Sequence, residues 1–258
     1  MNFISQDRLF APMKGSARLC AIVLLGLLFS LPTLAGDYLA KGHPDGIELL
    51  APPPPPGSAE EAADLNTVRA VVENRSKAET NVAMKDSGLA FALFAPAIGP
   101  EFSLEKLPKT RALLETLKTN IQEAIDTPKN HFRRLRPYQM DTNLNIGKPE
   151  PSFGYPSGHS TRGTVYALVL AQLFPEKAEA ILAIGRQIGW DRVVIAKHFP
   201  TDIYAGRVLG QAIVHEFASS PAFERDLAEA KAEVAAQRAE IRGQRAEGLR
   251  VAEPVGAK

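Results

Sequence analysis

The chain has 258 residues, of which 45% are hydrophobic and 23% are charged, an ordinary composition for a globular protein. Its formal net charge is only +1, so it lacks the basic excess that is typical of nucleic-acid-binding proteins. Aromatic residues make up 7% of the chain. Alanine and leucine are abundant, and both facts favour helices over a β-sandwich.

The first 35 residues have the pattern of a cleavable signal peptide. Three basic residues precede an apolar run over residues 19–31, which is followed by Pro-Thr-Leu-Ala and Gly36. The run is short for a membrane span, which needs about 20 residues; an uncleaved N-terminal anchor is the alternative. We therefore expect a periplasmic or secreted protein with no stable membrane insertion after signal cleavage.

The rest of the chain divides by composition into three parts. Residues 36–57 contain five consecutive prolines and are interpreted as a stiff lead-in. Residues 58–222 are expected to form a helical domain, and residues 223–258 a charged helical tail. Cleavage would remove Cys20, the only cysteine, so the domain would fold without disulfides. Cleavage would also remove three cations and one anion, which changes the net charge from +1 to −1.

Apolar periodicity, capping residues and prolines predict a succession of helices. They are expected to begin near residues 58, 78, 108, 127, 158, 176 and 200. The second should extend to Phe94, and Thr127–Pro128 should restart a helix at a bend. A long loop over 138–156 separates the two halves, and such loops are often functional. The sequence shows no strand-like alternation and no repeat, so the predicted fold is all-α, a single compact helical bundle.

Two basic residues in the first half have a spacing that suits an anion. Lys129 and Arg136 are seven residues apart, so a helix would place both on one face, two turns apart. Two cations so placed could hold a dianion. In isolation, however, a solvated basic face that includes Arg133 and Arg134 is the favoured interpretation.

The four residues Pro156-Ser157-Gly158-His159 introduce a strongly apolar helix. Ser157 is a good N-cap, and the free N–H groups of a helix N-terminus form an anion site. Gly158 permits close approach of the backbone to a ligand, and His159 would project beside it. The alternative is a plain helix cap followed by an incidental histidine.

A third segment places charged residues on apolar helix stripes. One stripe comprises Ile181, Ile184, Ile188 and Ile195. Arg192 falls on this stripe, and Asp202 falls on the stripe of the next helix, where buried charges require partners. His198 lies just before that helix, so Asp202 could fix its tautomer and leave the other ring nitrogen free to attack. A structural His–Asp pair, with the arginine paired elsewhere, is the alternative.

Taken together, the three segments resemble the signature of the type 2 phosphatidic acid phosphatase superfamily. The pattern is Lys129, Arg136-Pro137, Pro156-Ser157-Gly158-His159, Arg192, His198 and Asp202, in that order. The proline-rich lead-in resembles that of the bacterial class A nonspecific acid phosphatases. The likeness covers about residues 45–235, and it implies the all-α fold of the acid phosphatase/vanadium haloperoxidase type.

The resemblance also implies roles for individual residues. Donors to the phosphoryl oxygens are implied at Lys129, Arg136, Ser157, Gly158 and Arg192. His198 would be the nucleophile, oriented by Asp202, and His159 would protonate the leaving alkoxide and later activate water. Asp191 stands where the family usually has serine, and this added carboxylate could tune Arg192 or weaken anion binding.

The expected function is therefore a secreted acid phosphatase of broad specificity that hydrolyses small phosphate monoesters through a phosphohistidine. Three cations and helix-end amides can stabilise phosphoryl transfer, so we expect neither a metal nor a cofactor. No nucleic-acid partner is expected, and a homo-oligomer is left open. The alternatives are a vanadate-dependent haloperoxidase-like enzyme, a lipid phosphate phosphatase, and a phosphate-binding protein with impaired activity.

Overall fold

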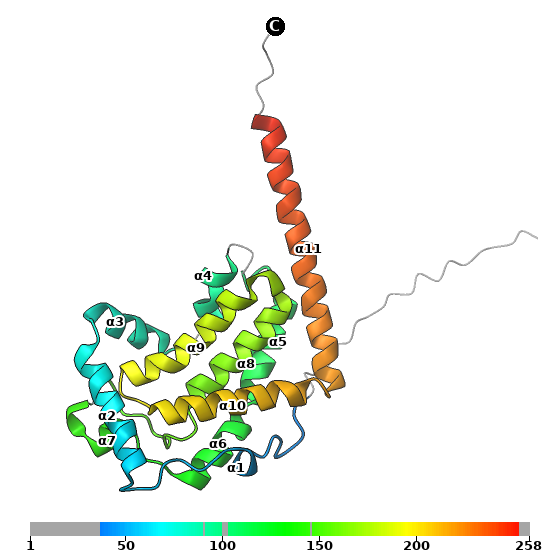
Figure 1. The fold of residues 1–258 in the computed structure, drawn as a ribbon. Helices are drawn as coiled ribbons and strands as arrows, with labels where there is room; N and C mark the ends of the chain where they lie inside the picture. The colour runs from blue at the N-terminus through cyan, green and yellow to red at the C-terminus, as the bar shows by residue number, and fades with distance from the viewer. Residues whose placement is uncertain (1–36, 90, 100–102, 145, 253–258) are drawn as a thin grey trace, which may run out of the picture. The chain divides into compact units, whose positions relative to one another are not determined.

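A computed structural model describes residues 37–89, 91–99, 103–144 and 146–252, which lie in one unit of the chain, Ala35–Lys258. Every regular element in these ranges is a helix, and none of them is a strand, which confirms the all-α prediction (Figure 1). The signal-peptide prediction falls on residues outside the described ranges. None of the described helices is long and apolar enough to span a membrane.

The described ranges contain α-helices (α) and short 3-10 helices (η). In chain order they are α1 Gly46–Leu49, α2 Ala59–Asn74, α3 Lys77–Asp86, η1 Phe91–Phe94, α4 Ala95–Ile98, α5 Pro108–Asn120, α6 Gln122–Phe132, α7 Pro137–Met140, η2 Thr142–Leu144, α8 Gly158–Leu173, η3 Pro175–Lys177, α9 Ala178–Val194, α10 Pro200–Phe217 and α11 Pro221–Ala252.

The second predicted helix is shorter than expected. It ends at Asp86 rather than at Phe94, and the separate short helices η1 and α4 follow. Leu89 has a positive φ of 43°, a left-handed conformation that an α-helix cannot contain. The apolar residues of the two parts therefore face different neighbours, although their spacing in the sequence suggests one continuous stripe.

The bend expected at Thr127–Pro128 lies elsewhere. The chain bends at Ile121, which is both the C-cap of α5 and the N-cap of α6. Helix α6 then continues through Pro128. Proline in a helix interior costs about 3 kcal/mol. Ile121 and Ile125 are both buried in the core. Burial of two isoleucines contributes about 1.5–3 kcal/mol each, which together is enough to offset the cost of the proline.

The centre of the fold is α8, which packs against α9 on one side and α10 on the other (Figure 1). Glycines allow these helices to approach very closely. A Cβ atom at Gly185 would lie 2.6 Å from the Cβ of Ala167, and one at Gly206 would lie 2.6 Å from the Ser157 carbonyl oxygen. This close packing fixes the N-terminus of α8 against the first turns of α10.

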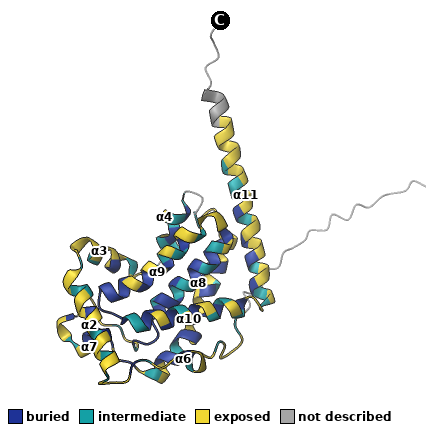
Figure 2. Cartoon of the chain, in the orientation of Figure 1, coloured by how far each residue is buried: buried dark blue, intermediate teal, exposed yellow. Residues whose placement is uncertain are grey.

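The first part of α11 belongs to the main core, although the sequence assigned residues 223–258 to a charged tail. Phe223, Leu227, Ala230 and Val234 are buried there. The carboxylate of Glu233 accepts hydrogen bonds from the backbone N–H groups of Lys109 and Thr110, both at 2.8 Å, and so caps α5. Beyond this point the helix is mostly exposed (Figure 2).

The proline-rich lead-in also packs on the domain. Its Tyr38 is buried between the rings of Phe217 and Phe223, with centroid distances of 5.6 and 5.4 Å. The Tyr38 hydroxyl donates a 2.7 Å hydrogen bond to Asp226 of α11. The beginning of the described chain is therefore joined to the end of α10 and the start of α11 through one aromatic cluster.

Candidate active site

In the connection between α9 and α10, one backbone carbonyl accepts two hydrogen bonds. The oxygen of Arg192 accepts hydrogen bonds from the N–H groups of Lys197 (2.8 Å) and His198 (3.2 Å). Asp202, at the third position of α10, accepts the Phe199 N–H through its side chain at 3.0 Å and so caps that helix. This tight turn fixes Arg192, His198 and Asp202 within one buried segment.

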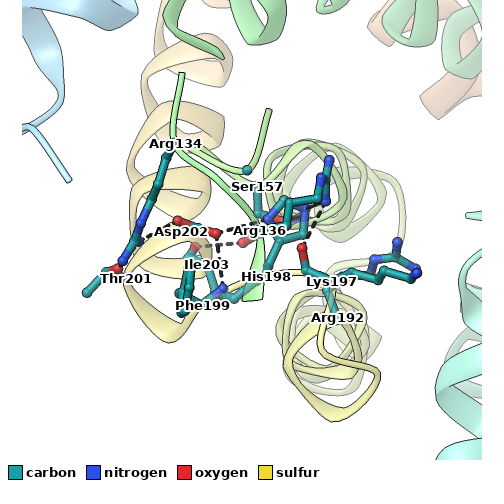
Figure 3. Close-up of polar contacts among 12 residues, drawn as sticks. Arg134, Arg136, Ser157, Arg192, Lys197, His198, Phe199, Thr201, Asp202 and Ile203 are labelled. Atoms are coloured by element: carbon teal, nitrogen blue, oxygen red, sulfur yellow. Dashed lines mark hydrogen bonds and ion pairs between the residues drawn. The ribbon is translucent and has the colours of Figure 1, made fainter. Parts of the chain in front are cut away.

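His198 is held between a carboxylate and a guanidinium (Figure 3). Its Nδ1 lies 3.1 Å from the Oδ2 of Asp202, and its Nε2 lies 3.1 Å from the Nη1 of Arg136. A guanidinium can only donate, so Nε2 must accept and Nδ1 must carry the proton. The imidazole is thus neutral, with its Nε2 lone pair directed toward the basic side chains.

Burial and the surrounding cations keep the imidazole neutral. Burial, followed by the charges of Arg136, Lys129 and Arg192, lowers the pKa of His198 well below its usual range. His159 also lowers that pKa. The residues of all three sequence segments are therefore near enough to act on His198.

Behind Asp202 lies a buried ion-pair network that the sequence did not predict. The guanidinium of Arg134 donates to Asp202 at 2.7 Å (Figure 3). It also donates to Asp64 of α2 at 2.8 Å, and its Cζ lies 4.1 Å from the centroid of the Phe199 ring. The hydroxyl of Thr201 joins the network by bonding to Asp64. Burial raises the pKa of Asp202, and the adjacent Arg134 opposes that rise. Arg134 therefore favours the carboxylate form that orients His198.

Arg192 has unused hydrogen-bonding capacity. Its side chain is buried, and its Nη2 donates to the carboxylate of Glu150. Among the described residues, neither its Nε nor its Nη1 has a hydrogen-bond partner. Buried donors are almost always satisfied in native proteins, so two orphan donors on one guanidinium point to a ligand. Nε and Nη1 lie on either side of the Nη2 group that donates to Glu150, so each of them could bind one oxygen of an anion.

Lys129 and Arg136 extend inward and are not a solvated basic face. The Nζ of Lys129 donates to the carbonyl of Phe153 at 2.7 Å, and Arg136 donates to the carbonyls of Ser152 and Lys197 at 2.8 and 2.9 Å. Burial and the nearby charge of Arg136 lower the pKa of Lys129 to about 7. The loop before α8 is thus held by the same cations that face His198.

Ser157 and Gly158 form the N-terminus of α8, as the capping pattern predicts. The Ser157 side chain accepts the N–H of Ser160 at 3.3 Å, and the Ser157 N–H donates to the backbone oxygen of Asp202 at 3.0 Å. Gly158 is packed so closely that a Cβ there would lie 3.0 Å from the Nη1 of Arg162. These contacts set the free amides of α8 beside the first turn of α10.

His159 faces a cavity at the edge of the site. Its Nε2 donates to the Ser87 carbonyl at 3.1 Å, because a carbonyl can only accept. Burial and the charge of Arg192 lower the pKa of His159 to about 4, whereas Ser87 and Glu150 act to raise it. The adjoining cavity of about 670 Å³ is lined by His159, Arg162 and Tyr166 together with Leu89, Phe91 and Leu104.

Asp191 lies beside the site and does not bind Arg192 directly. Its Oδ1 accepts a 2.7 Å hydrogen bond from Gln187, and its buried Oδ2 has no partner among the described residues. Burial and the Asp86 carboxyl group raise the pKa of Asp191 to about 7. The added carboxylate therefore interacts with Gln187 of α9 and is influenced by Asp86 of α3, and its described hydrogen bond does not involve Arg192.

The same residues offer no evident metal site. Within the described ranges, no group of three or more His, Cys, Asp or Glu side chains is arranged to hold a metal ion. The donors that converge around His198 are instead guanidinium, ammonium and backbone N–H groups, which bind anions.

Comparison with known proteins assigns the chain to a family. Residues 112–225 match the PAP2 superfamily. An acid phosphatase from Zymomonas mobilis is 30% identical over 202 residues, which cover 74% of this chain and 76% of that protein. Non-specific acid phosphatases from Salmonella typhimurium and Providencia stuartii are each 31% identical, over 55% and 59% of this chain and 59% and 66% of their own lengths.

A transmembrane PAP2-type phosphatidylglycerolphosphate phosphatase from Bacillus subtilis is a similar solved structure, with a TM-score of 0.48 and 21% identity over 64% of this chain and 87% of that one. The Zymomonas relative reaches 30% identity over three quarters of both proteins. The chain therefore belongs to the PAP2 superfamily and is a relative of the bacterial acid phosphatases.

Proposed function

We propose that this protein is a phosphomonoesterase that acts through a phosphohistidine at His198, without a metal ion. The observation that carries the proposal is the pairing of a neutral His198, whose Nε2 lone pair is free of a proton, with the two orphan donors of Arg192. A nucleophile and oxyanion donors would then act on the same bound phosphoryl group.

The anion site would consist of three cations and one helix terminus. Arg192 would donate to a phosphoryl oxygen through one of its two unpartnered nitrogens, Nε or Nη1, with Lys129 and Arg136 neutralising the remaining charge. Ser157 and Gly158 would add donors from the start of α8. Arg136 now donates to the Nε2 of His198, so it must transfer that hydrogen bond to a phosphoryl oxygen before His198 can attack.

In the first step, the Nε2 lone pair of His198 would form a bond to phosphorus while the phosphorus–ester oxygen bond breaks. Asp202 would accept a hydrogen bond from the Nδ1–H group of His198, which keeps its proton. The carboxylate would thereby stabilise the positive charge that develops on the ring. His159 would give a proton to the departing oxygen. Its pKa of about 4 in the free protein means that the negative charge of the bound phosphoryl group must raise the pKa first.

In the second step, His159 would take a proton from water, whose oxygen bonds to phosphorus as the bond to Nε2 breaks. Inorganic phosphate leaves, and both histidines return to their starting states. The cavity beside His159 would receive the alcohol portion of the substrate. Its mixed apolar and charged lining suits leaving groups of several kinds, which supports broad specificity for small phosphate monoesters.

The N-terminal pattern supports export to the periplasm or the medium as part of the same proposal. The proposal is tested by a phosphate-release screen over pH, with nucleotides, sugar phosphates and an aryl phosphate. We expect turnover at acidic pH, inhibition by vanadate and no effect of EDTA. Activity abolished by EDTA would contradict the metal-free mechanism, and halide oxidation in place of hydrolysis after vanadate addition would indicate the haloperoxidase alternative.

A further inference from the structure

The proposed mechanism assigns no role to one charged group at the site, the carboxylate of Glu150. It lies in the loop before α8, and its Oε1 accepts a hydrogen bond from the Nη2 of Arg192. Arg192 is 2% exposed at its side chain, whereas the Glu150 side chain is 31% exposed. An anionic side chain therefore occupies one edge of the guanidinium whose other two donors are unpartnered among the described residues.

The backbone of this loop holds Glu150 in place. The Glu150 N–H donates to the hydroxyl of Tyr138 at 2.9 Å, and Lys197 spans from the ring of Tyr138, 4.5 Å from its centroid, to the carbonyl of Lys148 at 2.9 Å. The charged groups that face the Glu150 carboxylate are Arg192 of α9, Arg136 at the start of α7, His159 of α8, and Lys197.

Glu150 is ionised before any ligand arrives. Burial raises the pKa of Glu150, but the charges of Arg192, Arg136 and His159 outweigh burial and hold that pKa below its usual range. A phosphoryl group bound at the Nε or the Nη1 of Arg192 would then share one guanidinium with a carboxylate. Two negative groups bound to the same guanidinium repel each other, and one of them takes up a proton.

We propose that Glu150 determines which protonation state of the phosphoryl group this site binds. Because Glu150 and the phosphoryl group share Arg192, the site binds the singly protonated monoanion in preference to the dianion. The inference rests on the proposed function, because it requires the phosphoryl group at Arg192. The second pKa of a phosphate monoester is about 6. Binding above that pH must therefore draw a proton from solvent, whereas binding below it need not.

The test is calorimetric binding of inorganic phosphate to the full chain at about pH 5 and about pH 8.5, on either side of the second pKa of inorganic phosphate, which lies above that of an ester. Glu150→Gln keeps an oxygen that can accept from Arg192 and removes the charge. We expect its Kd at the higher pH to be roughly tenfold lower than that of wild type, and the two Kd values at the lower pH to agree within about threefold. Glu179→Gln is the matched control, since Glu179 is an exposed α9 residue paired only with Arg186, and it should behave as wild type.

Two buffers of different ionisation enthalpy give a second measurement. At the higher pH, wild type should take up about one more proton per bound phosphate than Glu150→Gln. Lys129 contributes equally to both proteins, so the difference isolates Glu150. Equal pH dependence of the phosphate Kd in wild type and in Glu150→Gln would overturn the role assigned to Glu150 but not the proposed function.

Wild type provides a test that does not depend on the variant. Phosphate binding by wild type with no proton uptake at the higher pH would overturn the assignment of Glu150, even if Glu150→Gln does not fold. No phosphate binding by wild type at either pH would overturn both this inference and the proposed function.

Discussion

At the scale of single residues, the site consists of ionisable groups whose burial changes their chemistry. His198 is kept neutral by the cations around it, and His159 has a pKa of about 4. Lys129 is the cation whose charge changes nearest to neutral pH, because burial and Arg136 lower its pKa from 10.5 to about 7. Its ammonium form is therefore complete only below that pH.

This titration predicts a basic limb in the pH profile. As pH rises through about 7, Lys129 loses its proton and its attraction for the phosphoryl group, so kcat/KM should fall. Lys129→Arg keeps a positive charge at all of these pH values and should move the limb upward by about one unit or more. The exposed substitution Lys177→Arg is the control, and a limb that stays in place in Lys129→Arg would refute the role of Lys129.

Arg134 carries a second prediction at this scale. It is the buried cation between Asp64 and Asp202, and removing one member of a buried ion pair costs about 3–5 kcal/mol. We expect Arg134→Ala to lower the free energy of unfolding by that amount in urea titrations, whereas Arg133→Ala, at an exposed neighbouring position, should change it by less than about 1 kcal/mol. Similar losses in the two variants would show that the network is not a stabilising unit.

The sequence could identify Arg192 and Asp202 as buried because helical periodicity is a local property, and both residues fall on apolar stripes. It could not separate Arg134 from Arg133. The burial of Arg134 depends on Asp64 and Asp202, which lie 70 residues before it and 68 residues after it. Glu150 was missed for the same reason, since a loop residue has no periodicity and its partner Arg192 is 42 residues away.

At the scale of elements, the site depends on how closely α8 and α10 approach. Gly206 touches the Ser157 carbonyl, and Ser157 in turn donates its N–H to the Asp202 backbone. The positions of the helix ends follow from capping residues and prolines and were mostly predictable: α10 begins at Pro200 and ends at Phe217, as expected. The bend at Ile121 was not predictable, because it depends on which residues the core buries.

A pair of glycine substitutions tests this packing. Gly206→Ala would place a methyl group 2.6 Å from the Ser157 carbonyl, so the helices must separate. We expect a loss of about 1–3 kcal/mol in unfolding free energy, together with lower kcat. Gly243→Ala in α11 meets nothing within 4 Å and should stabilise the helix by up to about 1 kcal/mol. If Gly206→Ala keeps wild-type stability and kcat, the close approach does not position the site.

At the scale of the whole molecule, the first part of α11 joins the beginning of the described chain to the main core. Its buried residues lie in the main core, Glu233 caps α5, and Asp226 accepts the hydroxyl of Tyr38. The sequence could identify the charged exposed face of this segment. It did not indicate that a set of apolar residues spaced about one helical turn apart, Phe223, Leu227, Ala230 and Val234, closes the core.

Two truncations separate the parts of α11. A chain that stops after Ser220 loses four buried apolar side chains, which contribute about 1.5–3 kcal/mol each for the larger ones, so it should unfold or become insoluble. A chain that stops after Arg242 keeps those residues and the ion pair between Arg238 and Glu176. It should retain wild-type activity and melt within a few degrees of wild type by circular dichroism. A folded and active chain ending at Ser220 would contradict the assignment of α11 to the core.

The central claim is that His198 carries the phosphoryl group during turnover. Its most direct test is to mix the protein with a radiolabelled aryl phosphate, quench in alkali, digest, and locate the label. We predict acid-labile label on the peptide that contains His198, no label in His198→Ala, and more label in His159→Ala, because an aryl leaving group needs no proton but hydrolysis of the intermediate lacks its base. Label on another residue, or full turnover by His198→Ala, would contradict the account.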